Sequence, residues 1–126
     1  MRKRKDIEYD ILPKVMDVGE RWVSAIIRNT GDGAIRNVDV RLNSLDTLGL
    51  DIRHGSEFVP MLAPGQETTV NFRIGLYLST PVYLSMFGHR KDEDFYWESA
   101  TMTIRPKAVS AEVLSVFAKR EPHITI

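Results

Sequence analysis

Residues 25–42 constrain the fold of this chain more than any other stretch of its sequence. Two runs in which apolar residues fall on every second position are joined by a short segment that contains Gly31 and Gly33. Such alternation is typical of half-buried β-strands, and glycine tolerates the backbone conformations of tight turns. We therefore expect a β-hairpin here, with both glycines serving turn geometry and neither serving chemistry.

The same period-two pattern recurs along the chain, with turn signals every 8 to 15 residues. The alternation predicts that strands place these side chains in the core: Val23, Ala25, Ile27, Val38, Val40, Leu42, Val70, Phe72, Ile74, Val82, Leu84, Met86. Residues 95–105 are expected to form one continuous last strand. No helical period precedes residue 106, so the pattern predicts an all-β, immunoglobulin-like antiparallel β-sandwich of about seven strands. A small closed barrel is the structural alternative.

One turn is predicted in detail. Ala63-Pro64-Gly65-Gln66 places proline where a type II turn pre-sets φ and glycine where φ must be positive. We expect a strand to follow at once.

Length and charge set outer limits on function. A length of 126 residues indicates one domain. The sequence contains no cysteine, which excludes disulfides and cysteine chemistry. Four of its 17 basic residues lie in a basic tail over residues 1–5, leaving 13 basic against 17 acidic side chains for the rest. We therefore expect no nucleic-acid partner and no membrane span. The chain carries no export signal, which indicates the cytoplasm if it is complete.

The last residues do not continue the pattern. We assign residues 6–106 to the sandwich and residues 107–126 to a C-terminal extension. The apolar residues of this extension fit a short helix or an extra strand, and its sequence loosely repeats the opening strand. The extension is therefore a candidate for the start of a second, similar domain and for self-association.

Several motifs resemble the immunoglobulin-like family called CARDB and, more loosely, fibronectin type III modules. The matching residues are Val23–Ile27 leading to Asn29-Thr30-Gly31, then Asn37–Val40, and Leu62–Gly65 leading to Thr69–Phe72. The resemblance implies a non-catalytic spacer or adhesion module of a bacterial or archaeal cell-surface protein, often repeated in tandem. A surface location then follows if the chain is a fragment.

The sequence offers no catalytic motif. Its three histidines, His54, His89 and His123, are far apart, and no serine lies in a nucleophile elbow. We expect no catalytic residues, no cofactor and no metal site, and therefore not an enzyme. The acidic loop Asp92–Asp94 keeps calcium binding open as an alternative.

The strongest functional prediction concerns aromatic residues. If Val82, Leu84 and Met86 face the core, Tyr83 and Phe87 face outward, and we expect Trp97 to join them, with Arg41 close enough for a cation–π contact. Exposed patches of this kind mark interfaces. The alternative is that the long connection over residues 43–57 or the C-terminal segment folds over this face and buries the rings. The sequence thus predicts a non-catalytic structural or interaction module whose partner is a protein or a neighbouring domain. The alternative is a carbohydrate-binding module that uses the same face.

Overall fold

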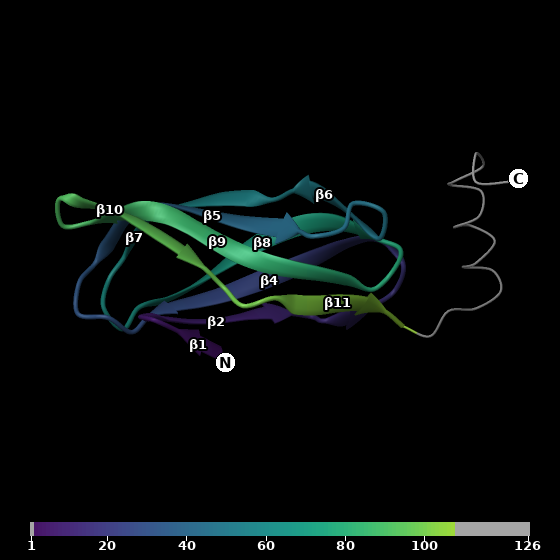
Figure 1. The fold of residues 1–126 in the computed structure, drawn as a ribbon, viewed down its shortest axis with the longest axis horizontal. Helices are drawn as coiled ribbons and strands as arrows, with labels where there is room; N and C mark the ends of the chain where they lie inside the picture. Colours follow the sequence, from purple (N-terminus) through teal and green to yellow (C-terminus); the bar gives the residue numbers. More distant parts are fainter. Residues whose placement is uncertain (1, 108–126) are drawn as a thin grey trace, which may run out of the picture.

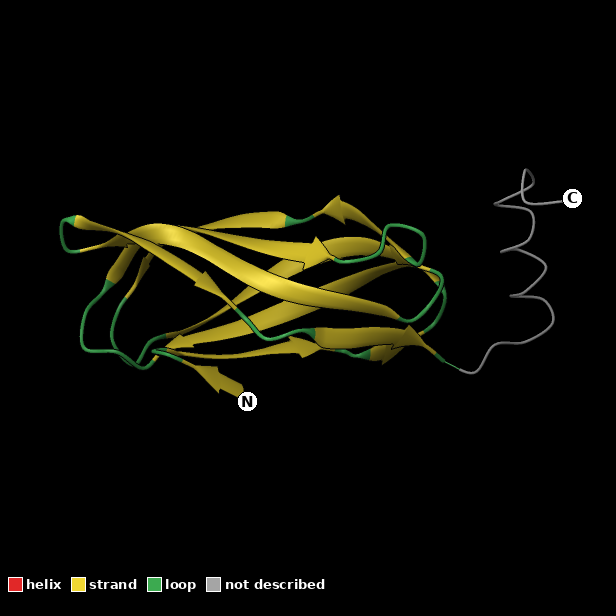
Figure 2. Ribbon diagram, in the orientation of Figure 1, coloured by secondary structure: helices red, strands yellow, loops and turns green. Residues whose placement is uncertain are grey.

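The computed structural model describes residues 2–107, which form β-strands joined by short loops and contain no helix (Figure 2). The strands are β1 (Arg2–Arg4), β2 (Ile7–Leu12), β3 (Val15–Met16), β4 (Gly19–Asn29), β5 (Ile35–Ser44), β6 (Leu50–His54), β7 (Ser56–Leu62), β8 (Glu67–Leu76), β9 (Thr80–Arg90), β10 (Glu93–Glu98) and β11 (Met102–Pro106). Consequently, nothing in this part of the chain is a helix that could cross a membrane.

The strands form two sheets that enclose the core between them (Figure 1). The first sheet has the order β1-β2-β4-β8-β6, and the second has the order β3-β11-β9-β5-β7, with β10 also paired to β9. Neighbouring strands are antiparallel except for β3 and β11, which are parallel. The predicted immunoglobulin-like β-sandwich is confirmed, and the barrel alternative is wrong.

The predicted hairpin over residues 25–42 is wrong in its pairing. β4 pairs with β2 and β8 in the first sheet, whereas β5 pairs with β7 and β9 in the second. Residues 30–34 therefore carry the chain from one sheet to the other. Alternation along a strand indicates which side chains are buried, but it does not identify the neighbouring strand.

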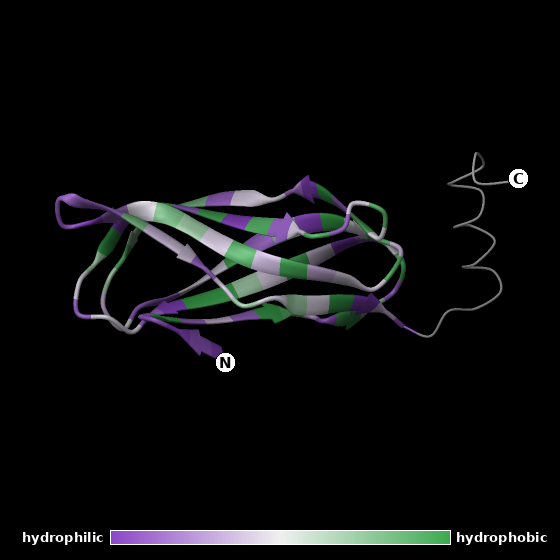
Figure 3. Cartoon of the chain, in the orientation of Figure 1, coloured by the Kyte–Doolittle hydropathy of each residue, from purple (hydrophilic) through white to green (hydrophobic). Residues whose placement is uncertain are grey.

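The predicted core is correct. Each of the twelve predicted side chains lies between the sheets with at most 6% of its surface exposed. The alternating colours along the strands in Figure 3 show the same period-two pattern. Local alternation sufficed here because successive side chains of a strand point to opposite faces.

The predicted turn at residues 63–66 is also confirmed. Gly65 has a φ of 79°, and the backbone N–H of Gln66 donates to the carbonyl of Ala63 at 2.9 Å. β8 follows at once.

Gly31 and Gly33 do not serve as positive-φ turn residues, because the described glycines with positive φ are Gly19 and Gly65. Gly31 is instead required by close packing. A Cβ at this position would lie only 2.9 Å from the Cβ of Asp6. At Gly33 the closest atom would be in the Arg90 side chain, at 3.5 Å, which is an ordinary contact.

Gly31→Ala is therefore expected to lower the free energy of unfolding by about 1–3 kcal/mol, because the added methyl forces backbone or side-chain shifts. Gly33→Ala is the matched control and should change it by less than about 0.5 kcal/mol. Urea denaturation followed by circular dichroism measures both. Equal stability of the two variants would contradict the packing role of Gly31.

The domain bounds predicted from the sequence stay a prediction at both ends of the chain. Arg2–Arg4, within the basic tail of residues 1–5, forms β1 and pairs antiparallel with β2. The extension hypothesis for residues 107–126 concerns residues that, after Lys107, lie outside the described part of the chain.

Candidate interaction surface

Trp97 does not lie on the outer face, and its predicted exposure is wrong. Its side chain is 2% exposed, because the expected strand over residues 95–105 is split into β10 and β11. The intervening residues shift the alternation by one position. Trp97 in β10 and Ser99 directly after it are buried, and Met102 and Ile104 are buried in β11. Counting back from Met102 therefore assigns Trp97 to the wrong face.

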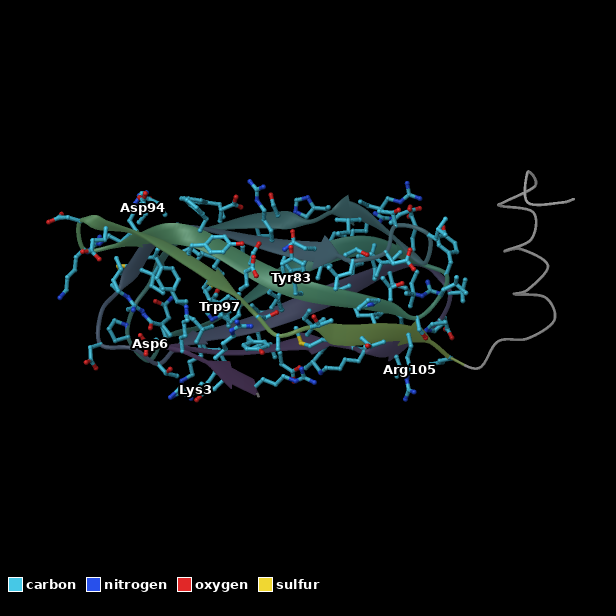
Figure 4. All side chains as sticks on the ribbon, in the orientation of Figure 1. Lys3, Asp6, Tyr83, Asp94, Trp97 and Arg105 are labelled. Carbon is cyan, nitrogen blue, oxygen red and sulfur yellow. The ribbon has the colours of Figure 1, made fainter. Side chains whose placement is uncertain are left out.

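Trp97 instead closes the side of the sandwich next to the N-terminal strands (Figure 4). Its ring meets that of Tyr9 edge-on, with centroids 5.1 Å apart, and its indole N–H donates to the carbonyl of Arg4 at 3.0 Å. The Tyr9 hydroxyl accepts a hydrogen bond from the N–H of Ala100, also at 3.0 Å. Trp97 therefore has a structural role.

The neighbouring residue, Tyr96, takes the predicted place of Trp97. The strand registers align Phe58 of β7 with Asp39 of β5, Asp39 with Phe87 of β9, and Phe87 with Tyr96 of β10. Phe58, Phe87 and Tyr96 are 62%, 51% and 54% exposed, and Tyr83 is half-buried on the same face. We call these four residues the aromatic face. Figure 4 places Tyr83 near the middle of β9.

Polar side chains lie among these rings. Arg41, predicted to contact an aromatic ring, instead forms an ion pair with Asp39 at 2.7 Å. The cation–π contacts found among residues 2–107 join Arg73 to Trp22 and Arg90 to Phe95. The charges of Arg41 and Asp39, which lie among the rings of the aromatic face, therefore neutralise each other.

Two further contacts order the surface. The Asn43 amide donates to the hydroxyl of Ser85 at 3.0 Å, between β5 and β9. The Tyr96 hydroxyl donates to the Glu98 carboxylate, and this hydrogen bond raises the pKa of Tyr96 above its usual value.

A shallow hollow of about 440 Å³ lies over this part of the second sheet. Its lining residues are Asn37, Asp39, Arg41, Asn43, Tyr83, Ser85, Phe87 and Tyr96. The hollow combines apolar rings with one acidic and one basic side chain. Such a surface can bind a ligand through stacking and hydrogen bonds.

Calcium binding by the acidic loop Asp92–Asp94 stays a prediction. Within the described residues, no three His, Asp or Glu side chains are grouped closely enough to hold a metal ion. Asp94 contacts His89 at 3.2 Å, across the β9–β10 turn.

Phe58 and Tyr96 were missed by the sequence-based reasoning. A local signal existed for Tyr96, because Asp94, Tyr96 and Glu98 share one parity while Phe95 and Trp97 share the other. Charged residues favour the outer face of a strand, so they marked Tyr96 as the exposed aromatic residue. Phe58 carried no comparable signal.

Comparison with known proteins gives the fold and no family. No protein-family model matches the sequence, and no curated protein matches it. The CARDB resemblance is therefore not confirmed.

Solved structures do match. The chain resembles a part of Escherichia coli alpha-2-macroglobulin that spans domain MG7 to the C-terminus, with a TM-score of 0.61 and 18% identity. This match covers 80% of the chain but only 16% of that structure. A second match is a chain in the complex of human zinc 2-glycoprotein and prolactin inducible protein, with a TM-score of 0.58 and 10% identity. This match covers 83% of the present chain and 97% of the matched chain. A third match is the GAE domain of GGA2p from Saccharomyces cerevisiae, with a TM-score of 0.56 and 11% identity. This match covers 82% of the chain and 93% of that domain's chain.

At these identities the likeness concerns the fold alone. The molecule is an immunoglobulin-like β-sandwich module, and its function has to be argued from its own surface.

Proposed function

We propose that this chain is a non-catalytic binding module that holds a protein partner against the aromatic face. The observation that supports this is the exposure of three aromatic rings, each more than half exposed, in one row across β7, β9 and β10. Leaving such rings in water costs free energy that a partner recovers by covering them. A spacer without a ligand has no need of this row.

The chemistry of the surface favours a protein. Aromatic residues and arginine are enriched in the centres of protein interfaces, and both are present here, with Arg41 beside the rings. One structural neighbour is part of a complex formed between zinc 2-glycoprotein and prolactin inducible protein. A place among other modules of a surface protein, as in the CARDB resemblance, is part of this proposal.

Photo-cross-linking tests the proposal. Benzoylphenylalanine replaces either Phe87, on the aromatic face, or Trp22, which is 58% exposed on the outer face of the first sheet and serves as the control. In cells that make the protein, we expect a discrete protein adduct from position 87 but not from position 22, with a severalfold lower yield in the Arg41→Ala variant. No adduct from position 87, or the same adducts from both positions, would contradict the proposal.

The hollow favours carbohydrate as the second candidate ligand, because Asp39, Asn43 and Ser85 offer hydrogen bonds beside aromatic rings. Tryptophan fluorescence would not report on it, since Trp22 lies on the other sheet and Trp97 is buried. Amide shifts in β5 and β9 during titration with oligosaccharides are the direct measurement. Shifts confined to these strands would favour carbohydrate over protein.

A further inference from the structure

The first sheet extends one strand further than the second sheet covers. β1 is the last strand of the first sheet, and all three of its residues are exposed even though it pairs with β2. In the second sheet, β10 pairs with residues 85–90 of β9 and is the outermost described strand along that part of β9. Figure 1 shows β1 at the lower margin of the body, next to β2. The position beside β10 and opposite β1 is therefore unfilled by residues 2–107.

The edge of β10 that borders this position has free backbone groups. The N–H of Ser99 donates to Leu84 of β9 at 2.8 Å, and the register continues from there through Trp97 opposite Met86. Because hydrogen-bonded pairs alternate along an antiparallel ladder, Phe95, Trp97 and Ser99 direct their backbone groups toward β9. The backbone groups of Asp94, Tyr96 and Glu98 then point away from it.

The unfilled position also has space. A crevice of about 200 Å³ lies here, lined by Arg4 and Lys5 on one side and by Tyr96, Trp97 and Glu98 on the other. Trp97 forms its inner wall, since the indole N–H bonds to the Arg4 carbonyl. An added strand would lie along the open side of this wall.

Opposite charges border the two faces of this position. Arg2 and Arg4 of β1 pair with Tyr9 and Ile7, whose side chains point into the sandwich, so Arg2 and Arg4 lie on the inner face. On the outer face, β10 presents Asp94 and Glu98. Side chains of an added strand would meet arginines on one face and carboxylates on the other.

We propose that the free edge of β10 accepts a strand from a partner polypeptide whose side chains alternate between basic and acidic. Its basic side chains lie beside Asp94 and Glu98, and its acidic side chains face Arg2 and Arg4. Its backbone pairs with Asp94, Tyr96 and Glu98, as in other cases of strand addition to an exposed sheet edge. This surface is a backbone edge, so the proposal is independent of ligand binding by the aromatic side chains.

A second copy of the chain is a poorer occupant. A two-fold pairing of β10 with itself, centred on Tyr96, sets Asp94 of one copy opposite Glu98 of the other. Like charges directly opposite each other destabilise an antiparallel pair. Charge complementarity therefore favours a different strand.

Two peptides of equal composition test the proposal on the full chain. In one octapeptide lysine and glutamate alternate; in the other, four lysines precede four glutamates. Nuclear magnetic resonance should show the alternating peptide shifting and protecting the amide of Tyr96, with an affinity at least about tenfold higher than that of its isomer. Methylating the alternating peptide on its β10-facing backbone nitrogens should abolish binding.

Two variants of one residue separate the backbone from the side chain. Tyr96→Pro removes a free N–H without breaking the ladder to β9, and proline is tolerated at such edge positions. It should weaken binding of the alternating peptide by about tenfold or more, whereas Tyr96→Thr, which keeps the N–H, should change it by less than about threefold.

Equal affinity for both peptides, or retained binding of the methylated peptide, would overturn the proposal. Protection of the Tyr96 amide in the absence of peptide would also overturn it. If that protection depended on residues 108–126, the edge would belong to the chain itself; if it depended on protein concentration, the edge would belong to a second copy. A negative result here leaves the cross-linking outcome at Phe87 unaffected, so the two proposals fail separately.

Discussion

Trp97→Ala is expected to lower the free energy of unfolding by about 3–5 kcal/mol, the cost typical of removing a large buried aromatic side chain. The variant loses the ring contact with Tyr9 and opens a cavity beneath β10. It also leaves the Arg4 carbonyl without its indole donor. This is the largest effect that we expect from a single substitution.

The adjacent residue supplies the control. Tyr96→Ala removes an aromatic ring of similar size that is 54% exposed, so it should cost less than about 1 kcal/mol. Urea denaturation monitored by circular dichroism gives both values. If the two variants were equally stable, or if Tyr96→Ala were the less stable one, the assignment of faces in β10 would be wrong.

Asn29→Ala is expected to cost about 3 kcal/mol, because it removes a fully buried amide that joins three segments. The Asn29 side chain donates to the carbonyls of Gly33 and Leu62 at 2.8 and 2.9 Å, and it accepts from the N–H of Gly31 at 3.0 Å. Without this side chain, those backbone groups lose their partners inside the protein. The loop that carries the chain between the sheets then loses its side-chain hydrogen bond to Leu62 at the end of β7.

Asn29→Asp refines this prediction, since aspartate keeps an acceptor for Gly31 but cannot donate to the two carbonyls when ionised. It should be at least as destabilising as alanine at pH 7, because it also buries a charge. Asn71→Ala, on the exposed outer face of β8, is the control and should cost less than about 1 kcal/mol. Stability of Asn29→Ala equal to that of Asn71→Ala would contradict the anchoring role.

The fold class could be predicted because alternation is a local property. Val23, Ala25 and Ile27 lie on one face whatever strand is next to them, and so do Val38, Val40 and Leu42. Pairing depends on the whole chain, so the expected hairpin between β4 and β5 was wrong. Gly31 resembled a turn residue, but its requirement is the nearness of Asp6, which is distant in sequence.

The candidate surface could be predicted only in part, for the same reason. Tyr83 and Phe87 follow the uninterrupted alternation of β9, and their side was correctly assigned. Trp97 was assigned across a break in the strand, where parity no longer carries over. Phe58 joins the aromatic face through the pairing of β7 with β5, which no local pattern encodes.

The central claim is that the side of the sandwich formed by β10 is free to accept a partner. Amide hydrogen exchange on the full chain measures this directly. We expect slow exchange at the backbone amide of Trp97, which is directed toward β9. The backbone amide of Tyr96 is directed away from β9 and should exchange fast. Slow exchange at both amides in the isolated protein would contradict the claim, because it would mean that the edge of β10 is already paired.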